Sequence, residues 1–155
     1  MRILLLSDVH ANLHALHATL ENAGGYDYAI YLGDAVDYGP HPDDVVDILR
    51  DHVDVWVMGN HDYAVAHGVD CYCSSILHDL SVYVRKYVTL RNVSASNIGY
   101  LRSLPLYWSG WITDKKILCV HGSPRDFLYE YVYPSLSDDE IISIIKNARE
   151  IDDEP

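Results

Sequence analysis

The feature that most constrains the fold of this chain is a repeated pairing of a short apolar run with a burst of polar residues. Four apolar runs each end directly before a cluster rich in Asp, His, Asn or Ser. The clusters are Ser7-Asp8-Val9-His10, Gly33-Asp34-Ala35-Val36-Asp37, Gly59-Asn60-His61-Asp62 and His121-Gly122-Ser123. In an open α/β sheet, ligands bind outside the carboxyl ends of the strands. The sequence therefore predicts that the four clusters meet at one edge of a single sheet.

The first half of the chain alternates between predicted strands and predicted helices. Strands are expected at residues 2–6, 28–32 and 53–58, and helices at residues 12–23 and about 43–51. This alternation predicts an α/β fold with a mostly parallel sheet, right-handed crossovers and flanking helices. The continuous apolar run of the first strand is typical of a strand that is buried on both faces.

The second half mixes helices with a hairpin. We predict a helix over residues 75–90, a short helix over 96–104, a hairpin of strands 106–112 and 116–120, and a last helix to about residue 149. The preceding residues 63–74 have no clear pattern and are interpreted as a loop with a helical turn, and residues 124–134 as a tyrosine-rich loop. Ser137 and Glu140 fit a capping box at the start of the last helix. In the helix over 75–90, the residues expected to face inward are Ile76, Leu77, Leu80, Val84 and Tyr87. The acidic tail 150–155 is expected to be frayed.

Length and charge narrow the class of protein. A chain of 155 residues with 49% hydrophobic residues predicts one folded domain, residues 1–155. Its formal net charge of −12 disfavours general nucleic-acid binding, which needs a basic face. The acidity still permits an anionic substrate, because a bound metal ion can invert the local field.

Targeting signals and cysteines point to an intracellular setting. The N-terminal apolar run has no basic segment before it and no small-residue cleavage site after it, and it is too short to cross a bilayer. We therefore expect a cytoplasmic protein without a membrane segment. The three cysteines argue against a disulfide framework or a zinc knuckle. Cys119 is expected in the core, and Cys71 and Cys73 are interpreted as free loop thiols rather than as a metal-binding pair.

The four clusters contain a set of potential metal ligands. Asp8 and His10 are two residues apart, so in extended backbone their side chains project to the same side. Asp34 can bridge two cations through its two oxygens, Asn60 offers an amide oxygen and His121 an imidazole nitrogen. This mixed oxygen and nitrogen set suits two divalent ions such as Mn, Fe, Zn or Ni, without fixing which. Two ions about 3.5–4 Å apart could activate water and clamp a phosphoryl group.

Two further residues complete the predicted catalytic set. His61 would stand beside the ions and protonate the leaving oxygen, and Asp62 would hold the His61 imidazole in position.

Each of the four clusters has a simple structural alternative when it is taken alone. An Asp-x-His is common, Gly33-Asp34 could be a turn, Asn60 a cap and His121 a core residue. It is the four clusters together, in order and each at a strand end, that predict a metal site.

The four clusters resemble the motifs of the calcineurin-like metallophosphoesterases, in particular those of their small bacterial and archaeal phosphodiesterase branch. The motifs are Ser7-Asp8-Val9-His10-Ala11-Asn12, Gly33-Asp34-Ala35-Val36-Asp37-Tyr38-Gly39-Pro40, Gly59-Asn60-His61-Asp62 and His121-Gly122-Ser123-Pro124-Arg125. The resemblance implies a shortened αββα sandwich and a metal-dependent phosphodiesterase or phosphatase. It also implies that the substrate is a phosphorylated small molecule or nucleotide.

The resemblance also implies a role for each ligand. Asp8 and His10 would hold the first metal, Asp34 would bridge, Asn60 and His121 would hold the second, and His61 would donate the proton. Arg125 is a weaker candidate for binding a phosphate oxygen, and a surface salt bridge is an equal alternative for it. Tyr129, Tyr131 and Tyr133 could wall a substrate pocket, with packing of their loop as the alternative.

The chain departs from the family pattern in two places. Ala11 stands where the family usually has glycine, and the closing Gly-His-x-His motif does not occur in the 155 residues. Two alternatives to an active enzyme therefore stay open, an impaired homologue that binds metal or ligand, and a fragment of a longer enzyme. An incomplete second sheet would also leave an edge and apolar surface bare, which predicts a homo-oligomer joined near residues 106–120 or the last helix.

Overall fold

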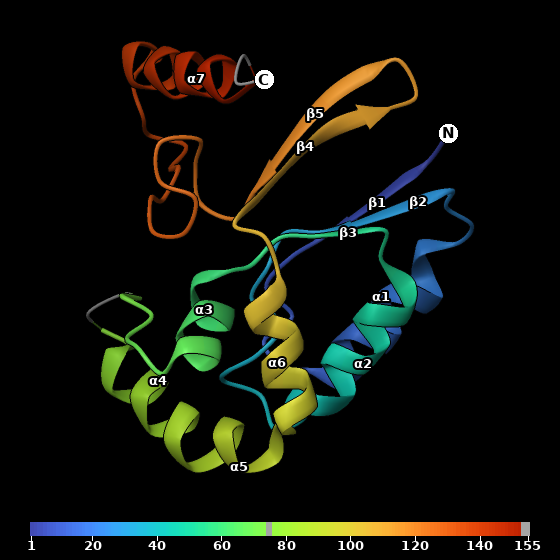
Figure 1. Cartoon of the computed structure of the whole chain (residues 1–155), viewed down its shortest axis with the longest axis vertical. Helices are drawn as coiled ribbons and strands as arrows, with labels where there is room; N and C mark the ends of the chain where they lie inside the picture. The colour runs from blue at the N-terminus through green and yellow to red at the C-terminus, as the bar shows by residue number, and fades with distance from the viewer. Residues whose placement is uncertain (74–75, 153–155) are drawn as a thin grey trace.

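The computed structural model describes residues 1–73 and 76–152, which form an α/β fold around a parallel sheet. Figure 1 shows this sheet, with strands in the order β1 (Ile3–Leu6), β2 (Tyr28–Tyr31) and β3 (Val55–Trp56). Strands β4 (Tyr107–Ile112) and β5 (Lys115–Val120) form a separate antiparallel hairpin. The predicted parallel sheet and the predicted hairpin are both confirmed.

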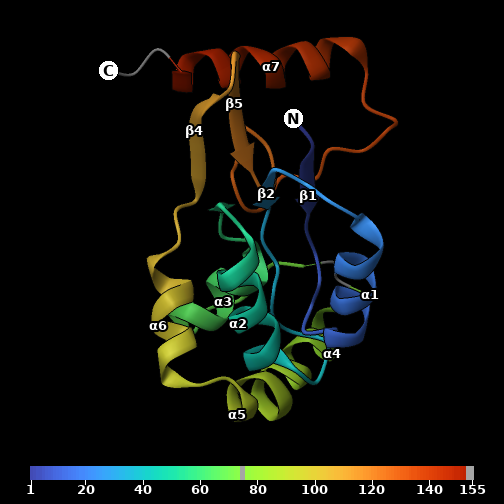
Figure 2. The same cartoon turned by 90° about the vertical axis from the view of Figure 1, so that its right-hand side faces the viewer.

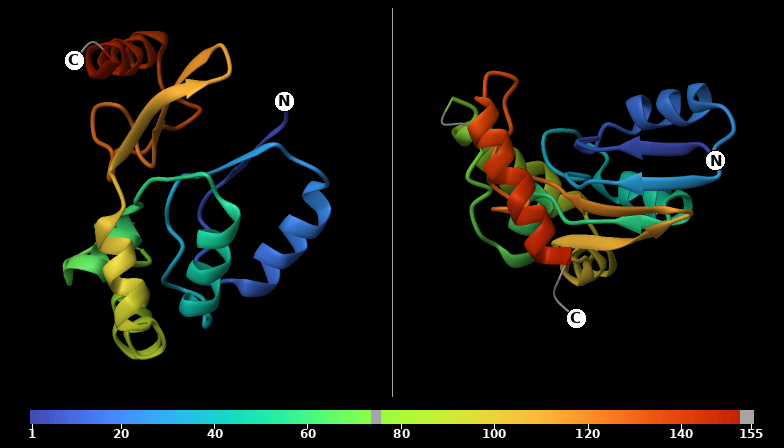
Figure 3. Two further views of the ribbon diagram at one scale, coloured as in Figure 1. Left: turned by 45° about the vertical axis from the view of Figure 1, so that its right-hand side comes forward. Right: turned by 90° about the horizontal axis from the view of Figure 1, so that it is seen from above.

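Three helices cover one side of the parallel sheet, and the hairpin lies on its other side (Figures 1 and 3). They are α1 (Leu13–Ala23), α2 (Pro42–His52) and α6 (Ala95–Ser103). The Asn12 side chain accepts a hydrogen bond from the Ala15 amide, which fixes the start of α1. The core on this side contains Leu16, Tyr31, Leu49, Trp56 and Leu101.

The remaining helices lie between β3 and β4 and at the end of the described chain. They are α3 (Asn60–His67), α4 (His78–Val84), a π-helical turn η1 (Arg85–Thr89), α5 (Leu90–Asn92) and α7 (Asp138–Asp152). Figure 2 shows α7 on the hairpin side of the molecule, far from α5. The predicted capping box is present, because Glu140 accepts from the Ser137 amide at 2.8 Å and Ser137 accepts from the Glu140 amide at 3.4 Å. Residues 153–155 of the tail lie outside the described residues.

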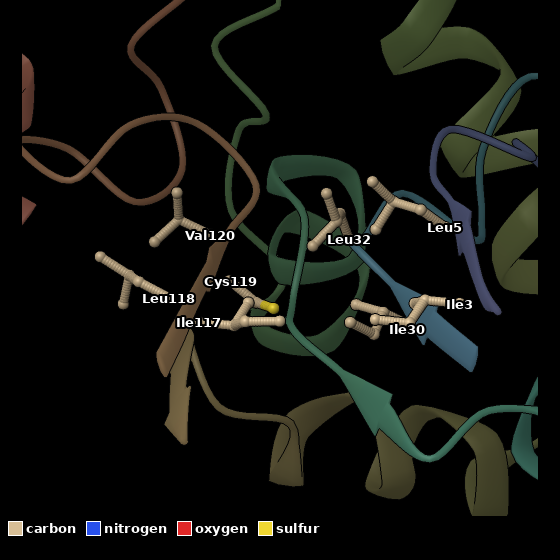
Figure 4. Close-up of a pocket in the computed structure, with 8 residues that line it drawn as sticks. All are labelled: Ile3, Leu5, Ile30, Leu32, Ile117, Leu118, Cys119 and Val120. Carbon is tan, nitrogen blue, oxygen red and sulfur yellow. The ribbon is translucent and has the colours of Figure 1, made fainter. Parts of the chain in front are cut away.

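The prediction that β1 is buried on both faces is wrong, because Leu4 and Leu6 on one face are half-buried and the other face is exposed. Ile3 and Leu5 are 39% and 59% exposed, because the hairpin packs over β2 and β3 but not over β1. The result is an apolar groove of about 400 Å³ between β1, β2 and β5. Figure 4 shows it lined by Ile3, Leu5, Ile30, Leu32, Ile117, Leu118, Cys119 and Val120.

The inward face predicted for the helix over residues 75–90 is also wrong. Leu77, Leu80 and Tyr87 are 46%, 51% and 40% exposed, and Ile76 is 88% exposed, whereas Val84 is buried as expected. Ile76 and Leu77 lie before α4 begins at His78, and Leu80 lies before the π-helical turn, so the turn can shift only the positions from Arg85 onward. The polar residues Ser81, Arg85 and Thr89 are buried instead. Residue 75, where the helix was predicted to begin, lies outside the described residues.

The predicted third strand is shorter than expected, and the stretch predicted as a loop with a helical turn is helical to His67 and a loop over residues 68–73. Only Val55 and Trp56 pair with β2, and α3 begins at Asn60, within the polar cluster itself. Among the described residues, no helix is both long and apolar enough to cross a membrane.

Candidate metal centre

The polar clusters meet where β1, β2, β3 and β5 end. The prediction that they meet at the edge of a single sheet is wrong for the fourth cluster, because His121 follows β5 of the separate antiparallel hairpin. The loops after β1 and β2 run side by side and exchange backbone hydrogen bonds. The Asp8, His10 and Ala11 amides donate to the carbonyls of Gly33, Asp34 and Ala35, at 2.9, 3.0 and 2.7 Å. These contacts hold the first two clusters in register.

The same two loops store backbone strain. The non-glycine residues with left-handed backbone there are Asp8 (φ 55°), His10 (48°), Ala11 (53°), Asp34 (62°), Asp37 (67°) and Tyr38 (59°). Such conformations cost about 1 kcal/mol each and persist where the surroundings enforce them. Ala11 is one of them and is fully buried.

Two glycines allow the ends of β2 and β3 to touch. Gly33 has a φ of 98°, and a Cβ there would lie 2.4 Å from the Gly59 nitrogen. A Cβ on Gly59 would lie 2.1 Å from Oδ1 of Asp34. A side chain at either position would push the second cluster away from the third.

Asp34 is the centre of the site. Its side chain is buried, and Oδ2 lies 3.8 Å from Nε2 of His10 and 3.4 Å from Nε2 of His121. Its Oδ1 accepts a hydrogen bond from the His61 amide at 2.8 Å. Burial raises the pKa of Asp34, but its contacts with His121, His61 and His10 lower it overall. A carboxylate that faces two imidazoles in this way can join two metal-binding halves.

The first half of the site contains Asp8 and His10. Nδ1 of His10 lies 3.0 Å from the Val36 carbonyl oxygen and donates to it, which leaves Nε2 as the free ligand nitrogen. That Nε2 lies 3.8 Å from Oδ1 of Asp8. The Asp8, Asp34 and His121 ligand atoms lie within 4.8 Å of one another.

The second half contains Asn60 and His121. Nδ2 of Asn60 donates to the Cys71 carbonyl at 2.7 Å, so Oδ1 points to Nε2 of His121 at 3.0 Å. Nδ1 of His121 lies 2.7 Å from the Leu32 carbonyl oxygen. Both ring nitrogens of His121 therefore face acceptors. Burial lowers the pKa of His121, but the hydrogen bond and charge of Asp34 outweigh it and raise the pKa to about 9.

These contacts predict a pH-dependent stability of the metal-free protein. The folded-state pKa of His121 lies above the ordinary value of 6.5, so its contribution is complete below pH 6.5 and is lost as the pH rises through about 9. We expect the free energy of unfolding to fall by up to about 3 kcal/mol across that window. Urea unfolding in chelator at several pH values measures this fall. The His121→Gln variant should flatten it, and equal slopes in both proteins would contradict the prediction.

His61 is positioned by a residue that the sequence analysis did not assign. Nδ1 of His61 lies 2.9 Å from Oδ2 of Asp37, and the same oxygen accepts from Nε of Arg85 at 2.8 Å. Burial lowers the pKa of His61, but the hydrogen bond to Asp37 and the charge of Asp34 raise it overall. The available signal was the second aspartate of the Gly33-Asp34-Ala35-Val36-Asp37 cluster.

The prediction that Asp62 holds the His61 imidazole is wrong. Both Asp62 oxygens are bound to backbone amides, because Asp62 is the third residue of α3 and its carboxylate turns back toward the start of the helix. Oδ2 accepts from Asp34 and Gly59 at 2.8 and 3.2 Å, and Oδ1 accepts from Ala35 and Val36 at 2.9 and 3.3 Å. Asp62 therefore joins the second cluster to the third as a structural residue.

Arg125 forms a salt bridge, which was the alternative to phosphate binding in the sequence analysis. Its guanidinium contacts Glu130, with Nε 3.0 Å from Oε2, and Nη1 lies 3.3 Å from the Ser143 hydroxyl.

A small cavity of about 190 Å³ opens beside the metal ligands. It is lined by Asp8, Asn60, His121, Gly122, Leu128, Tyr129, Glu130 and Tyr131. Of the predicted pocket tyrosines, Tyr129 and Tyr131 line this cavity.

The donor set fits divalent cations. Carboxylate and amide oxygens together with imidazole nitrogens are ligands of Mn, Fe, Zn and Ni. The ligand atoms of Asp34 lie within 4.8 Å of those of Asp8 and His121, and equally of those of His10 and His61. The Asp34 carboxylate thus belongs to two groups of potential metal ligands, one with Asp8 and His121 and one with His10 and His61.

Comparisons with known proteins agree with this geometry. The sequence model of the calcineurin-like phosphoesterase family matches residues 1–152. An uncharacterized protein of Methanocaldococcus jannaschii, MJ0912, is 33% identical over an aligned length of 146 residues, and the match covers 88% of this chain and 56% of that protein.

Solved structures show the same likeness. The structure of a metallophosphoesterase from Sphaerobacter thermophilus is 39% identical, with a TM-score of 0.68 over 86% of this chain and 51% of that chain. The hypothetical protein PH1004 from Pyrococcus horikoshii OT3 shares the fold, at 23% identity and a TM-score of 0.78 over 96% of this chain and 66% of that one. This chain spans between half and two thirds of these relatives. The family implies divalent metal cofactors, and this chain belongs to the calcineurin-like phosphoesterase family.

Proposed function

We propose that this chain is a metal-dependent phosphoesterase that hydrolyses its substrate at a dinuclear metal centre. The observation that carries the proposal is the position of Asp34, whose Oδ2 lies within 4 Å of both His10 and His121. Asp8 and His10 would hold one ion, Asn60 and His121 the other, and Asp34 both. When bound, such ions polarise phosphoryl oxygens and lower the pKa of water.

His61 is proposed to protonate the leaving oxygen. Its raised pKa keeps the imidazole protonated closer to neutral pH, which suits a general acid. Asp37 accepts from Nδ1, and this contact orients the ring and stabilises its charged form. Arg85 holds Asp37 in turn, and all three side chains are buried.

The Asp37→Asn variant tests this arrangement. Asparagine keeps the size of the side chain but removes the negative charge that stabilises the His61 imidazolium. We expect kcat to fall about 10²-fold, with KM changed little. Steady-state kinetics measures the effect, and a thermal melt checks that the variant folds. A kcat close to that of the wild type would show that Asp37 does not support catalysis.

The cavity beside the metal ligands suggests the class of substrate. Its volume of about 190 Å³ has room for a phosphoryl group and a small attached moiety. Tyr129 and Tyr131 line it and offer aromatic surface to a base or an aryl group, and the net charge of −12 disfavours a long polyanion. We propose a phosphorylated small molecule or nucleotide, with a phosphodiester as the first candidate.

The direct test is hydrolysis of bis(p-nitrophenyl) phosphate with manganese, with p-nitrophenyl phosphate as the monoester control. We expect turnover that requires the metal, that a chelator removes, and that favours the diester. An absence of turnover with any of Mn, Fe, Zn and Ni at high protein concentration would contradict an active phosphoesterase.

A second candidate function is metal or ligand binding without catalysis. It is favoured because the 155 residues contain no Gly-His-x-His sequence, so within them each ion has fewer candidate ligands than the family resemblance implies. Calorimetry with manganese separates the two. Two tightly bound ions per chain would favour the enzyme, and weak or single binding would favour the impaired homologue.

We also propose that a second copy of the chain covers the apolar groove, giving a homo-oligomer. β5 pairs only with β4 among the described residues, and Leu5 beside it in the groove is 59% exposed. Uncovered apolar surface next to an unpaired strand edge favours association. Sedimentation velocity at micromolar concentration should show a dimer, and Leu5→Lys should give a monomer. A monomeric wild-type chain would contradict this prediction.

A further inference from the structure

A second cluster of metal-ligating side chains adjoins His61. The sulfur atoms of Cys71 and Cys73 and a ring nitrogen of His61 all lie within 4.8 Å of one another. Both thiols are free and come from the segment between α3 and α4. The proposed phosphoesterase uses neither of them. Two thiols and an imidazole together are a typical ligand set for zinc.

The segment that carries the thiols is fixed by contacts of its own. The carbonyl oxygen of Cys71 accepts from Nδ2 of Asn60 at 2.7 Å, and its sulfur lies 3.4 Å from the Ser81 hydroxyl. Ser81 in turn accepts from Nη2 of Arg85 at 2.9 Å. Cys71 is fully buried and Cys73 is half-buried, so one thiol is anchored and the other is reachable from solvent. A cation can enter at Cys73.

The distances are close to those of a tetrahedral zinc site. Zinc binds sulfur at about 2.3 Å and imidazole nitrogen at about 2.0–2.1 Å, which places neighbouring ligand atoms about 3.6–3.8 Å apart. The three ligand atoms therefore need to approach one another by about 1 Å at most.

The two neighbouring sites differ in the metals they prefer. The first contains carboxylates, an amide oxygen and imidazoles, a set that accepts Mn. The second contains two thiols, which select zinc, cadmium or Cu(I) and bind Mn poorly. Manganese and a thiophilic cation can thus be directed to different positions in the same protein.

We propose that Cys71, Cys73 and His61 form an inhibitory site for a thiophilic divalent cation, zinc in the first instance. Binding forms two sulfur–metal bonds and one nitrogen–metal bond, and the two thiol protons leave to solvent. A cation on the free ring nitrogen removes the proposed proton donor, and a cation on Nδ1 displaces Asp37. The inhibition rests on the proposed function of His61, whereas the binding does not.

Cadmium provides a binding test that is independent of activity. Cadmium is titrated into protein with excess manganese while the ultraviolet charge-transfer band of cadmium thiolate is recorded. We expect one equivalent per chain in the wild type, no comparable band in Cys73→Ser, and about tenfold or weaker affinity in His61→Asn. Cys119→Ser removes a thiol in the hairpin and should behave like the wild type. A wild type without the band, or the same endpoint in Cys73→Ser, would overturn the site.

Inhibition is tested separately in the manganese-dependent diesterase assay. Zinc that lowers wild-type turnover about tenfold should leave Cys73→Ser close to its activity without zinc, and Cys119→Ser should be as sensitive as the wild type. Equal inhibition of the wild type and Cys73→Ser would overturn the regulatory role. If no protein turns over, the proposed function fails, but the cadmium titration still decides whether the thiol site exists.

Discussion

Replacing Asp34 with asparagine is expected to abolish metal-dependent hydrolysis, with kcat/KM at least about 10³-fold lower than in the wild type. The buried Asp34 carboxylate is the group that faces both His10 and His121. Asparagine keeps an oxygen for the His61 amide but removes the charge shared by the two ligand groups. Charge stabilisation by bound metal ions is worth several kcal/mol, and each 1.36 kcal/mol changes a rate tenfold. The measurement is diester hydrolysis across a range of manganese concentrations.

Binding and a matched control distinguish a metal effect from general damage. Calorimetry should show that Asp34→Asn binds manganese far more weakly than the wild type. Asp114→Asn, which removes an equal charge from the exposed hairpin turn, should change neither binding nor turnover. If Asp34→Asn kept its metal affinity and its rate, the dinuclear centre would be refuted.

The largest expected effect on stability is that of Asp62→Ala, which should lower the free energy of unfolding by about 4 kcal/mol. The substitution leaves the backbone amides of Asp34, Ala35, Val36 and Gly59 without their acceptor. A buried donor without a partner costs about 1–3 kcal/mol, and the four share one carboxylate. Urea unfolding of the metal-free protein measures the loss.

The unfolding experiment on Asp62→Ala needs a defined pH and a matched control variant. Burial and the charge of Asp34 raise the pKa of Asp62 to about 7, so the experiment is best done near pH 8, where the carboxylate is ionised. Asp54→Ala is the matched control, because the Asp54 carboxylate accepts from one backbone amide among the described residues, that of Ala29 at 2.8 Å. We expect it to cost about 1 kcal/mol. A loss in Asp62→Ala no larger than in Asp54→Ala would contradict the structural role.

Together these variants separate two functions that the sequence places side by side in Gly59-Asn60-His61-Asp62. Asn60 and His61 point toward the site, whereas Asp62 points back into the protein and binds the loop after β2. The three residues are consecutive in the first turn of α3, and consecutive side chains of a helix point in different directions. Loss of activity in Asp62→Ala would therefore follow from loss of structure, and Asp34→Asn should fold.

The sequence by itself predicted the parallel sheet, the hairpin, the capping box at Ser137 and the meeting of the four polar clusters. These features depend on local periodicity and on the common direction of parallel strands, and both are written in the order of residues along the chain. The common direction of β1 and β2 accounts for the convergence of Asp8 and Asp34, whereas His121 reaches them from the separate hairpin that packs over the sheet.

Only the tertiary structure decided which carboxylate holds His61, which face of β1 is exposed, and which side of the helix over residues 75–90 is buried. The sequence analysis assigned Asp62 as the partner of His61, whereas the fold brings Asp37, which has left-handed backbone, to the imidazole. The buried positions of the helix over residues 75–90 include the polar residues Ser81, Arg85 and Thr89, and Arg85 contacts Asp37, so apolar periodicity pointed to the wrong side. Each of these outcomes depends on contacts between residues far apart in the chain, which local pattern does not encode.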